Sequence, residues 1–310
     1  MSYIDSRHLL DRAVREASYG ELQLPAGFWS TWNDAQRLKW ACERYAADSP
    51  VAATPTTWKV LYGSPKRPRP AIRNLIYHVC PLKTNDLWRA NASQLAKRID
   101  VFNGHRRIAV ATGDNLYPAK FAIREMERAG IVAEFMTLPN DPLLREVATF
   151  LPLLLSVARP VANEATFYAH TKGIDTACEL PNATRGATLW RNAAYHHLLD
   201  RAGDCMVELE THVAAGIHKM IWADNPPYPS GLRHGNWMLA GTFFWFRNDA
   251  VFSHPRWRNI PIDRYGAEAW LAGMFAPHEA ASMYQLWNPN EFPTPNPYDP
   301  AIYPDPIEDD

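Results

Sequence analysis

The sequence is poor in cysteine, in net charge and in long apolar runs, and each shortage excludes a class of protein. Its 4 cysteines are scattered, without the close pairs of a zinc knuckle or a redox dithiol. A formal charge of -1 gives no overall basic field that would attract nucleic acid or an anionic membrane. The longest apolar run, residues 150–157, is interrupted by Pro152 and is too short to cross a bilayer.

The N-terminal residues 1–16 are rich in charge and lack the apolar stretch of a signal peptide. Together with unpaired cysteines, this predicts a cytoplasmic protein with reduced thiols and no membrane span. Two glycine-rich loops are also missing. No G-x-G-x-x-G follows the first predicted strand and no Walker-type loop occurs, which removes the main support for a dinucleotide or P-loop site.

Three regions differ in composition. Residues 1–70 are predicted to form a helical N-terminal extension that ends in a proline- and arginine-rich linker, because proline at 65, 68 and 70 is incompatible with a helix or a central strand. Residues 71–287 are predicted to form the main domain. Residues 288–310 are rich in proline and acidic residues, contain no lysine or arginine, and are predicted to be an extended tail.

Strands and helices alternate in the main domain. Strands are predicted at 74–80, 107–112, 131–138 and 165–169, and helices at 86–100, 118–129 and 142–155, with Gly130 ending the second helix. Further on, we expect a helix at 188–209, strands at 214–222 and 238–246, and helices at 267–275 and 278–287. This order predicts an α/β fold: an open, mostly parallel sheet with helices on both faces and a ligand crevice at the carboxyl ends of the strands.

Cationic and hydrogen-bonding groups follow the fourth predicted strand, which reads Tyr168-Ala-His-Thr-Lys-Gly173. The pair Trp190-Arg191 comes next at the expected start of a helix. An aromatic segment then runs from Gly235-Asn236-Trp237 to Trp245. Cations at a strand end followed by aromatic surfaces are what a phosphorylated sugar donor requires.

These segments, between residues 73 and 287, resemble a group of bacterial and phage glycosyltransferase-like proteins whose pattern is tyrosine-x-HTKG, a WR pair and a GN-aromatic strand. The resemblance implies a GT-A-like (Rossmann-like) catalytic domain that uses a nucleotide-sugar donor, with a UDP-sugar favoured. Most enzymes of that fold have an Asp-x-Asp metal motif where this chain has His170, Thr171 and Lys172, so the need for a divalent metal stays open. No metal-ligating set of residues is identified.

The resemblance also suggests roles for individual residues. Lys172 and His170 are predicted to contact the diphosphate, with Arg191 as a further cation aided by the amides of a helix N-terminus. Glu268 is predicted to take the proton from the acceptor hydroxyl in an inverting transfer, with Asp263 as second choice. The remaining predicted donor-binding residues are Thr171, Gly173, Asp175, Trp190, Asp114, Asn236, Trp237, Phe244 and Trp245.

The sequence leaves the acceptor open. A polysaccharide precursor is one candidate, and a hydroxylated base in phage-type DNA is another, held by the basic residues Lys66, Arg67, Arg69 and Arg73. The alternative to a glycosyltransferase is a non-catalytic module of the same fold that binds a nucleotide sugar or a carbohydrate. A third possibility is a different α/β enzyme, such as a phosphatase or a methyltransferase.

Overall fold

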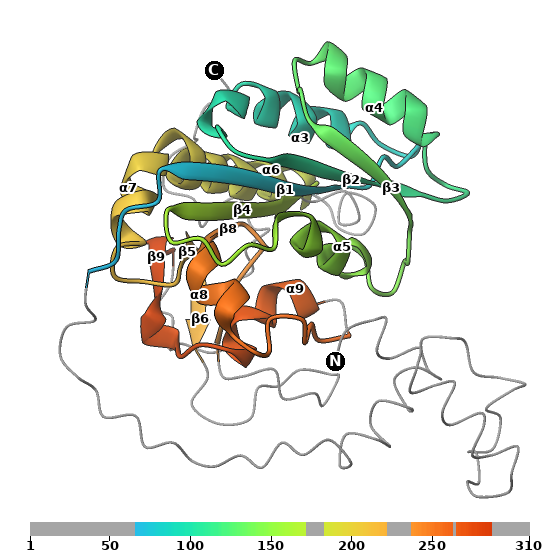
Figure 1. The fold of residues 1–310 in the computed structure, drawn as a ribbon. Coiled ribbons are helices and arrows are strands. Elements are labelled where there is room, and N and C mark those ends of the chain that lie inside the picture. Colours follow the sequence, from blue (N-terminus) through green and yellow to red (C-terminus); the bar gives the residue numbers. More distant parts are fainter. Residues whose placement is uncertain (1–65, 172–182, 222–236, 263–264, 287–310) are drawn as a thin grey trace, which may run out of the picture.

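A sheet of 7 strands organises the part of the chain that the computed structural model describes, residues 66–171, 183–221, 237–262 and 265–286 (Figure 1). The strand order is β3-β2-β1-β4-β8-β5-β9. Every neighbouring pair is parallel except the two pairs made by β8, which is antiparallel to both β4 and β5. The strands are β1 (Ile72–Val79), β2 (Arg106–Thr112), β3 (Glu134–Pro139), β4 (Glu164–His170), β5 (Ala214–Ile217), β8 (Phe244–Arg247) and β9 (Ala280–Tyr284).

Helices cover both faces of the sheet, which confirms the predicted α/β class (Figure 1). One face packs against α3 (Leu87–Ala96), α4 (Ala119–Arg128), α6 (Ala183–Tyr195) and α7 (Ala202–Glu208). The other face packs against α5 (Val147–Val157), α8 (Asn248–Ser253) and α9 (Gly266–Ala269). Two hydrophobic cores result, one in each layer.

The central strands are apolar on both faces because both faces are buried. In β4, Ala165, Phe167 and Ala169 lie in the first core. Tyr168 lies in the second core. Such continuous apolar runs are typical of parallel strands between two helical layers. This agrees with the strands predicted at 74–80, 107–112 and 165–169, whereas the strand predicted at 131–138 is the edge strand β3, which is only partly buried.

Helix boundaries differ from the predictions by a few residues. The helix predicted at 142–155 begins only at Val147, and the one predicted at 86–100 ends at Ala96 and is followed by a 3-10 turn at Ile99–Val101. Gly130 adopts a positive φ of 98° after α4, as its predicted role at the helix end requires. The helix predicted at 188–209 is α6, a π-helical segment at His196–Asp200 and then α7.

Three predicted elements are wrong in type or extent. The segment predicted as a helix at 278–287 contains β9, because residues from Ala280 pair in parallel with β5. The strand predicted at 214–222 is divided into β5 and β6 (Lys219–Ile221) at His218, whose φ is 50°. The strand predicted at 238–246 is likewise divided into β7 (Trp237–Leu239) and β8. In both cases one piece, β6 or β7, belongs to a separate 2-stranded sheet.

The predicted N-terminal helices, most of the linker, the loop at 225–235 and the acidic tail lie outside the described residues. Within the described ranges, no helix combines the length and the apolar character needed to span a membrane.

Candidate functional site

The order of the strands reverses between β1 and β4. The chain moves from β1 to β2 and β3 on one side, then crosses to β4 on the other. In open α/β sheets, ligands bind beyond the carboxyl ends of the strands at such a reversal. The two strand ends are joined there: the Thr171 amide donates to the His78 carbonyl at 3.0 Å, and the Cys80 amide donates to the Thr171 hydroxyl at 3.1 Å. The predicted residues His170 and Thr171 therefore lie at this edge.

A tight turn before β8 lies at the same edge, because β8 runs antiparallel to β4. Its residues Gly241 and Thr242 have φ values of 88° and 61°. The Gly241 carbonyl is 3.3 Å from His170 Nε2, and the Gly241 amide donates to Glu268 Oε1 at 2.9 Å. His170 and Glu268, which were predicted to have different roles, therefore both contact the backbone of Gly241.

Trp190 explains why residue 241 is a glycine. A Cβ atom at this position would lie 2.7 Å from the Trp190 ring, and the positive φ disfavours any side chain. Trp190 is 4% exposed and its ring also contacts that of His218 at a centroid distance of 5.8 Å. Trp190 thus supports the turn from behind.

Buried polar side chains lie behind Glu268. The Thr242 hydroxyl is 3.4 Å from Glu268 Oε1 and also 3.4 Å from Oε1 of Glu146, the residue that precedes α5. Burial, followed by the charges of Glu146 and Glu268, raises the pKa of Tyr168 well above its usual value, so this phenol stays neutral.

His78 lies on the same side of the sheet, where its Nδ1 is 2.8 Å from the Thr149 hydroxyl. Burial is the main cause that lowers the pKa of His78 to about 4, and the imidazole is therefore neutral near pH 7. Nothing in the sequence distinguishes Glu146 or Thr242 from an ordinary helix-start glutamate and an ordinary strand residue. Both were missed as site residues.

Arg191 does not lie at a helix N-terminus, so that prediction is wrong. Helix α6 begins at Ala183, and Arg191 is inside it and only 3% exposed. Its Nε and Nη2 atoms donate to Asn192 Oδ1 at 3.1 and 2.9 Å. Its charge acts on the buried Tyr77 and Tyr195, whose pKa values it lowers against the larger effect of burial. These contacts place the guanidinium in the core beside α6.

Three predicted stacking aromatics are core residues. Trp237 is 1% exposed, while Phe244 and Trp245 are completely buried. Both indole nitrogens are used internally: Trp237 donates to the Phe275 carbonyl at 2.8 Å and Trp245 to the Leu198 carbonyl at 2.7 Å. No ring face is left for a sugar or a base, which corrects the prediction for these residues.

Asp114 is exposed in the turn after β2, at the same edge of the sheet but apart from the Gly241 turn. Its carbonyl accepts a hydrogen bond from Lys83 Nζ at 3.0 Å, and residues 82 and 116 form a β-bridge beside it. Its carboxylate is thus accessible where the loops after β1 and β2 meet.

The basic residues that were expected to hold DNA lie before β1 or, for Arg73, at its start, at the opposite edge of the sheet. Lys66 and Arg69 form ion pairs with Glu210, and Arg73 Nε donates to the Val101 carbonyl. The backbone amide of Arg67 donates to the Glu210 carbonyl at 2.8 Å. These contacts attach the linker to the domain, and their position gives the DNA hypothesis no support.

Five predicted residues, Lys172, Gly173, Asp175, Asn236 and Asp263, lie outside the described part of the chain. Among the residues that are described, no group of three or more His, Cys, Asp or Glu side chains is arranged to hold a metal ion.

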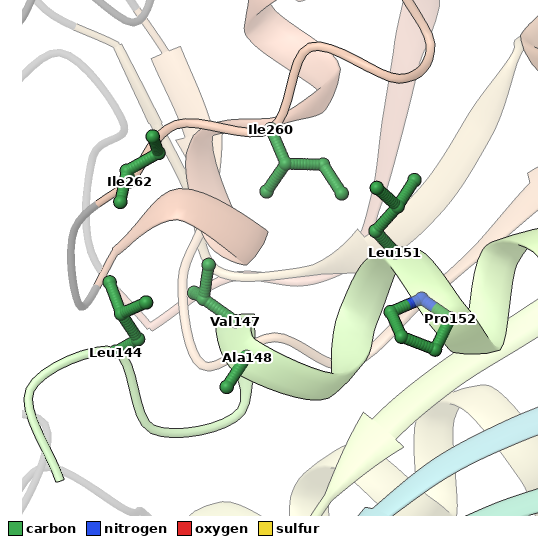
Figure 2. A pocket seen from close by; sticks show the side chains of 7 residues that line it. All are labelled: Leu144, Val147, Ala148, Leu151, Pro152, Ile260 and Ile262. Carbon is green, nitrogen blue, oxygen red and sulfur yellow. The ribbon is translucent and has the colours of Figure 1, made fainter. Parts of the chain in front are cut away.

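An apolar hollow lies between α5 and the segment that contains Ile260 and Ile262 (Figure 2). It begins next to Glu146, since Val147 lines it, and Ile260 and Ile262 form the opposite wall. Its volume of about 50 Å³ is far below the 300 Å³ or more that is usual for a ligand pocket. Its complete lining is Leu144, Val147, Ala148, Leu151, Pro152, Ile260 and Ile262. We conclude that this hollow is a packing feature beside the site.

Comparison with known proteins gives little independent guidance. No protein-family model matches the chain, and no curated protein matches it. Among solved structures, the chain is similar to a protein from Desulfovibrio desulfuricans that is described as a nucleotide-diphospho-sugar transferase, with 12% identity and a TM-score of 0.33 over 69% of this chain and 83% of that one. A similarity of this size carries no argument about function. The residues at the sheet edge must therefore support any functional conclusion.

Proposed function

We propose that the protein is a glycosyltransferase that moves a sugar from a nucleoside-diphosphate donor to a hydroxyl acceptor. One observation carries the proposal: His170 and Glu268, from β4 and α9, meet at Gly241 on the edge of the sheet where the strand order reverses. The resemblance of residues 168–173 to the HTKG pattern of glycosyltransferase-like proteins agrees with a donor diphosphate at this place. A UDP-sugar is the favoured donor.

The roles proposed for His170 and Glu268 follow from their positions. His170 Nε2 faces a carbonyl oxygen, which only accepts hydrogen bonds, so Nε2 carries the hydrogen. His170, together with Lys172, is assigned to the departing diphosphate, whose growing charge must be stabilised. Glu268 is only partly buried and one of its oxygens is fixed by Gly241, which suits a carboxylate that takes a proton from an incoming hydroxyl. Inversion follows from this direct role of Glu268.

Binding is the first test. Thermal-shift measurements against a panel of nucleotide sugars, with manganese and with a chelator, should show stabilisation by at least one donor, since a ligand that binds only the folded state raises its stability. The comparison of manganese with chelator decides metal dependence. Absence of stabilisation by every donor would contradict the proposal.

Turnover is the second test. Release of nucleoside diphosphate should be strongly reduced in Glu268→Gln and in Lys172→Ala, while donor binding survives in Glu268→Gln. Glu208→Gln is the matched control, because Glu208 lies on α7 and pairs with His212 away from the site. Tight donor binding without turnover under any metal condition would instead identify a non-catalytic binding module.

A further inference from the structure

Thr242 is held in a costly backbone conformation. Its φ of 61° is in the left-handed region, which is unfavourable for a β-branched residue. The residue is also completely buried. Such strain persists only where the surroundings enforce it, and strained residues concentrate at functional sites.

The strained backbone places the Thr242 hydroxyl between two carboxylates. It is 3.4 Å from Oε1 of Glu268 and 3.4 Å from Oε1 of Glu146. Glu146 is 7% exposed and precedes the first residue of α5, where the helix dipole favours a negative charge. In the described part of the chain, Thr242 is the residue whose hydroxyl reaches the Glu146 carboxylate.

A hydroxyl has one hydrogen and can accept as well as donate. While Glu268 is ionised, the Thr242 hydrogen can point to Glu268. Once Glu268 has taken a proton on its other oxygen, Oε1 is a weaker acceptor that keeps the hydrogen bond from the Gly241 amide, and the Thr242 hydrogen can turn to Glu146 Oε1. Both states of Glu268 are then hydrogen-bonded, with no loss or gain of a proton by Thr242 or Glu146.

We propose that Thr242 and Glu146 form a buried hydrogen-bond relay that positions Glu268 and supports both its ionised and its protonated state. The inference rests on the proposed role of Glu268 as the base. Thr242 and Glu146 are positioning residues, since both are buried while Glu268 is partly exposed. Tyr168 on β4 is completely buried, and after burial the charges of both carboxylates raise the pKa of its hydroxyl.

Kinetics of the full-length protein test the relay. Thr242→Val keeps the branched shape and the backbone strain but removes the hydroxyl, so kcat should fall by about 100-fold, the size of effect that a small misplacement of a reacting group produces. Thr242→Ser restores the hydroxyl and should remain within a few-fold of the wild type. Donor KM should change little in either variant, because neither residue is assigned to donor binding.

The pH profile separates the relay from a merely structural role. Glu146→Gln removes a like charge near Glu268, which makes ionisation of Glu268 easier, so the acidic limb of the kcat/KM profile should move to lower pH. Thr166→Val is the matched control: it also removes a buried threonine hydroxyl, which donates to Asn248 at 2.6 Å near the amino end of β4. Equal effects of Thr242→Val and Thr166→Val, or an unmoved acidic limb in Glu146→Gln, would overturn the relay.

A measurement without turnover keeps the two proposals distinguishable. In protein carrying glutamate labelled with carbon-13 at the carboxyl position, Thr242→Val should shift the signals of both Glu146 and Glu268, while Thr242→Ser and Thr166→Val should leave both near their wild-type positions. If the wild type proves inactive, the proposed function fails, yet these shifts still establish the hydrogen-bonded chain. Unchanged Glu146 and Glu268 signals in Thr242→Val would refute it.

Discussion

The two edges of the central sheet treat buried polar groups differently. At the amino edge, Arg247 is completely buried and donates to the carbonyls of Pro68, Leu209 and Ala162 as well as to Asp249. Glu164, 2% exposed, accepts from Asn74 and Asn248 and pairs with Arg159. Each of these two buried charges has several partners, as a stabilising role requires. This edge also holds the linker to the domain.

At the carboxyl edge, the polar groups are less completely satisfied. The Tyr168 hydroxyl is buried and has no hydrogen-bond partner among the described residues. Thr242 has a strained backbone, and one threonine hydroxyl serves two carboxylates. The difference teaches that the cost in stability is concentrated at the edge where the strand order reverses. Such local costs are typical of functional sites.

The largest expected loss of stability comes from a substitution at the amino edge of the sheet. Arg247→Met leaves three backbone carbonyls without their buried donor, and we expect it to lower the free energy of unfolding by about 3–5 kcal/mol. Arg201→Met is the matched control, since Arg201 pairs with Asp204 at a half-exposed position. It should cost at most about 0.5 kcal/mol. Urea unfolding curves measure both, and similar losses would refute the contrast.

The next largest effect is a pH-dependent change in the free energy of unfolding, caused by His78 at the carboxyl edge. Because the pKa of His78 is about 4 in the folded protein and 6.5 when unperturbed, the unfolded chain binds more protons between these values. The stabilisation of the folded state by neutral His78 is therefore complete above pH 6.5 and is lost as the pH falls toward 4. The loss from His78 amounts to about 3 kcal/mol.

His78→Gln should make this acid-induced decline in unfolding free energy distinctly smaller. His197, whose pKa burial also lowers to about 4, adds to the decline in the same direction, but less because it is only half buried. His278→Gln removes an exposed imidazole and serves as control. A decline of equal size in wild type and His78→Gln would show that other groups cause it.

The smallest expected effect concerns Tyr168. Since its hydroxyl is buried without a hydrogen bond, Tyr168→Phe should leave the free energy of unfolding within about 0.5 kcal/mol of the wild type or raise it slightly. Tyr77→Phe gives the comparison, because the Tyr77 hydroxyl is 3.1 Å from that of Tyr195. A Tyr168→Phe variant that loses more stability than Tyr77→Phe would show that the Tyr168 hydroxyl has a partner after all.

Much of the fold could be predicted because its central strands are apolar on both faces. The position of β9 could not, since the short segment Ala-Ala-Ser-Met-Tyr fits either a helix or a strand and its pairing with β5 decides. The division of residues 238–246 was equally hidden, because a positive φ at a threonine has no sequence signal. Local patterns contain no information about such tertiary constraints.

The candidate site was predictable only in part. His170 and Glu268 were chosen from a pattern and from position along the chain, and the structure places them on the same glycine. The prediction that Trp237, Phe244 and Trp245 stack on a ligand was wrong. The sequence does not distinguish a strand aromatic that faces a ligand from one that faces the core. Glu146 was missed because a glutamate before an apolar helix looks like an ordinary helix start.

Strand β8 is fastened at both of its ends. Arg247 anchors its last residue to three separate loops, and the turn that precedes its first residue is wedged against Trp190. A strand of 4 residues that is held at both ends cannot shift relative to its neighbours on its own. Strand β8 is thereby a fixed reference in the sheet, held through Arg247 at one end and through Trp190 at the other.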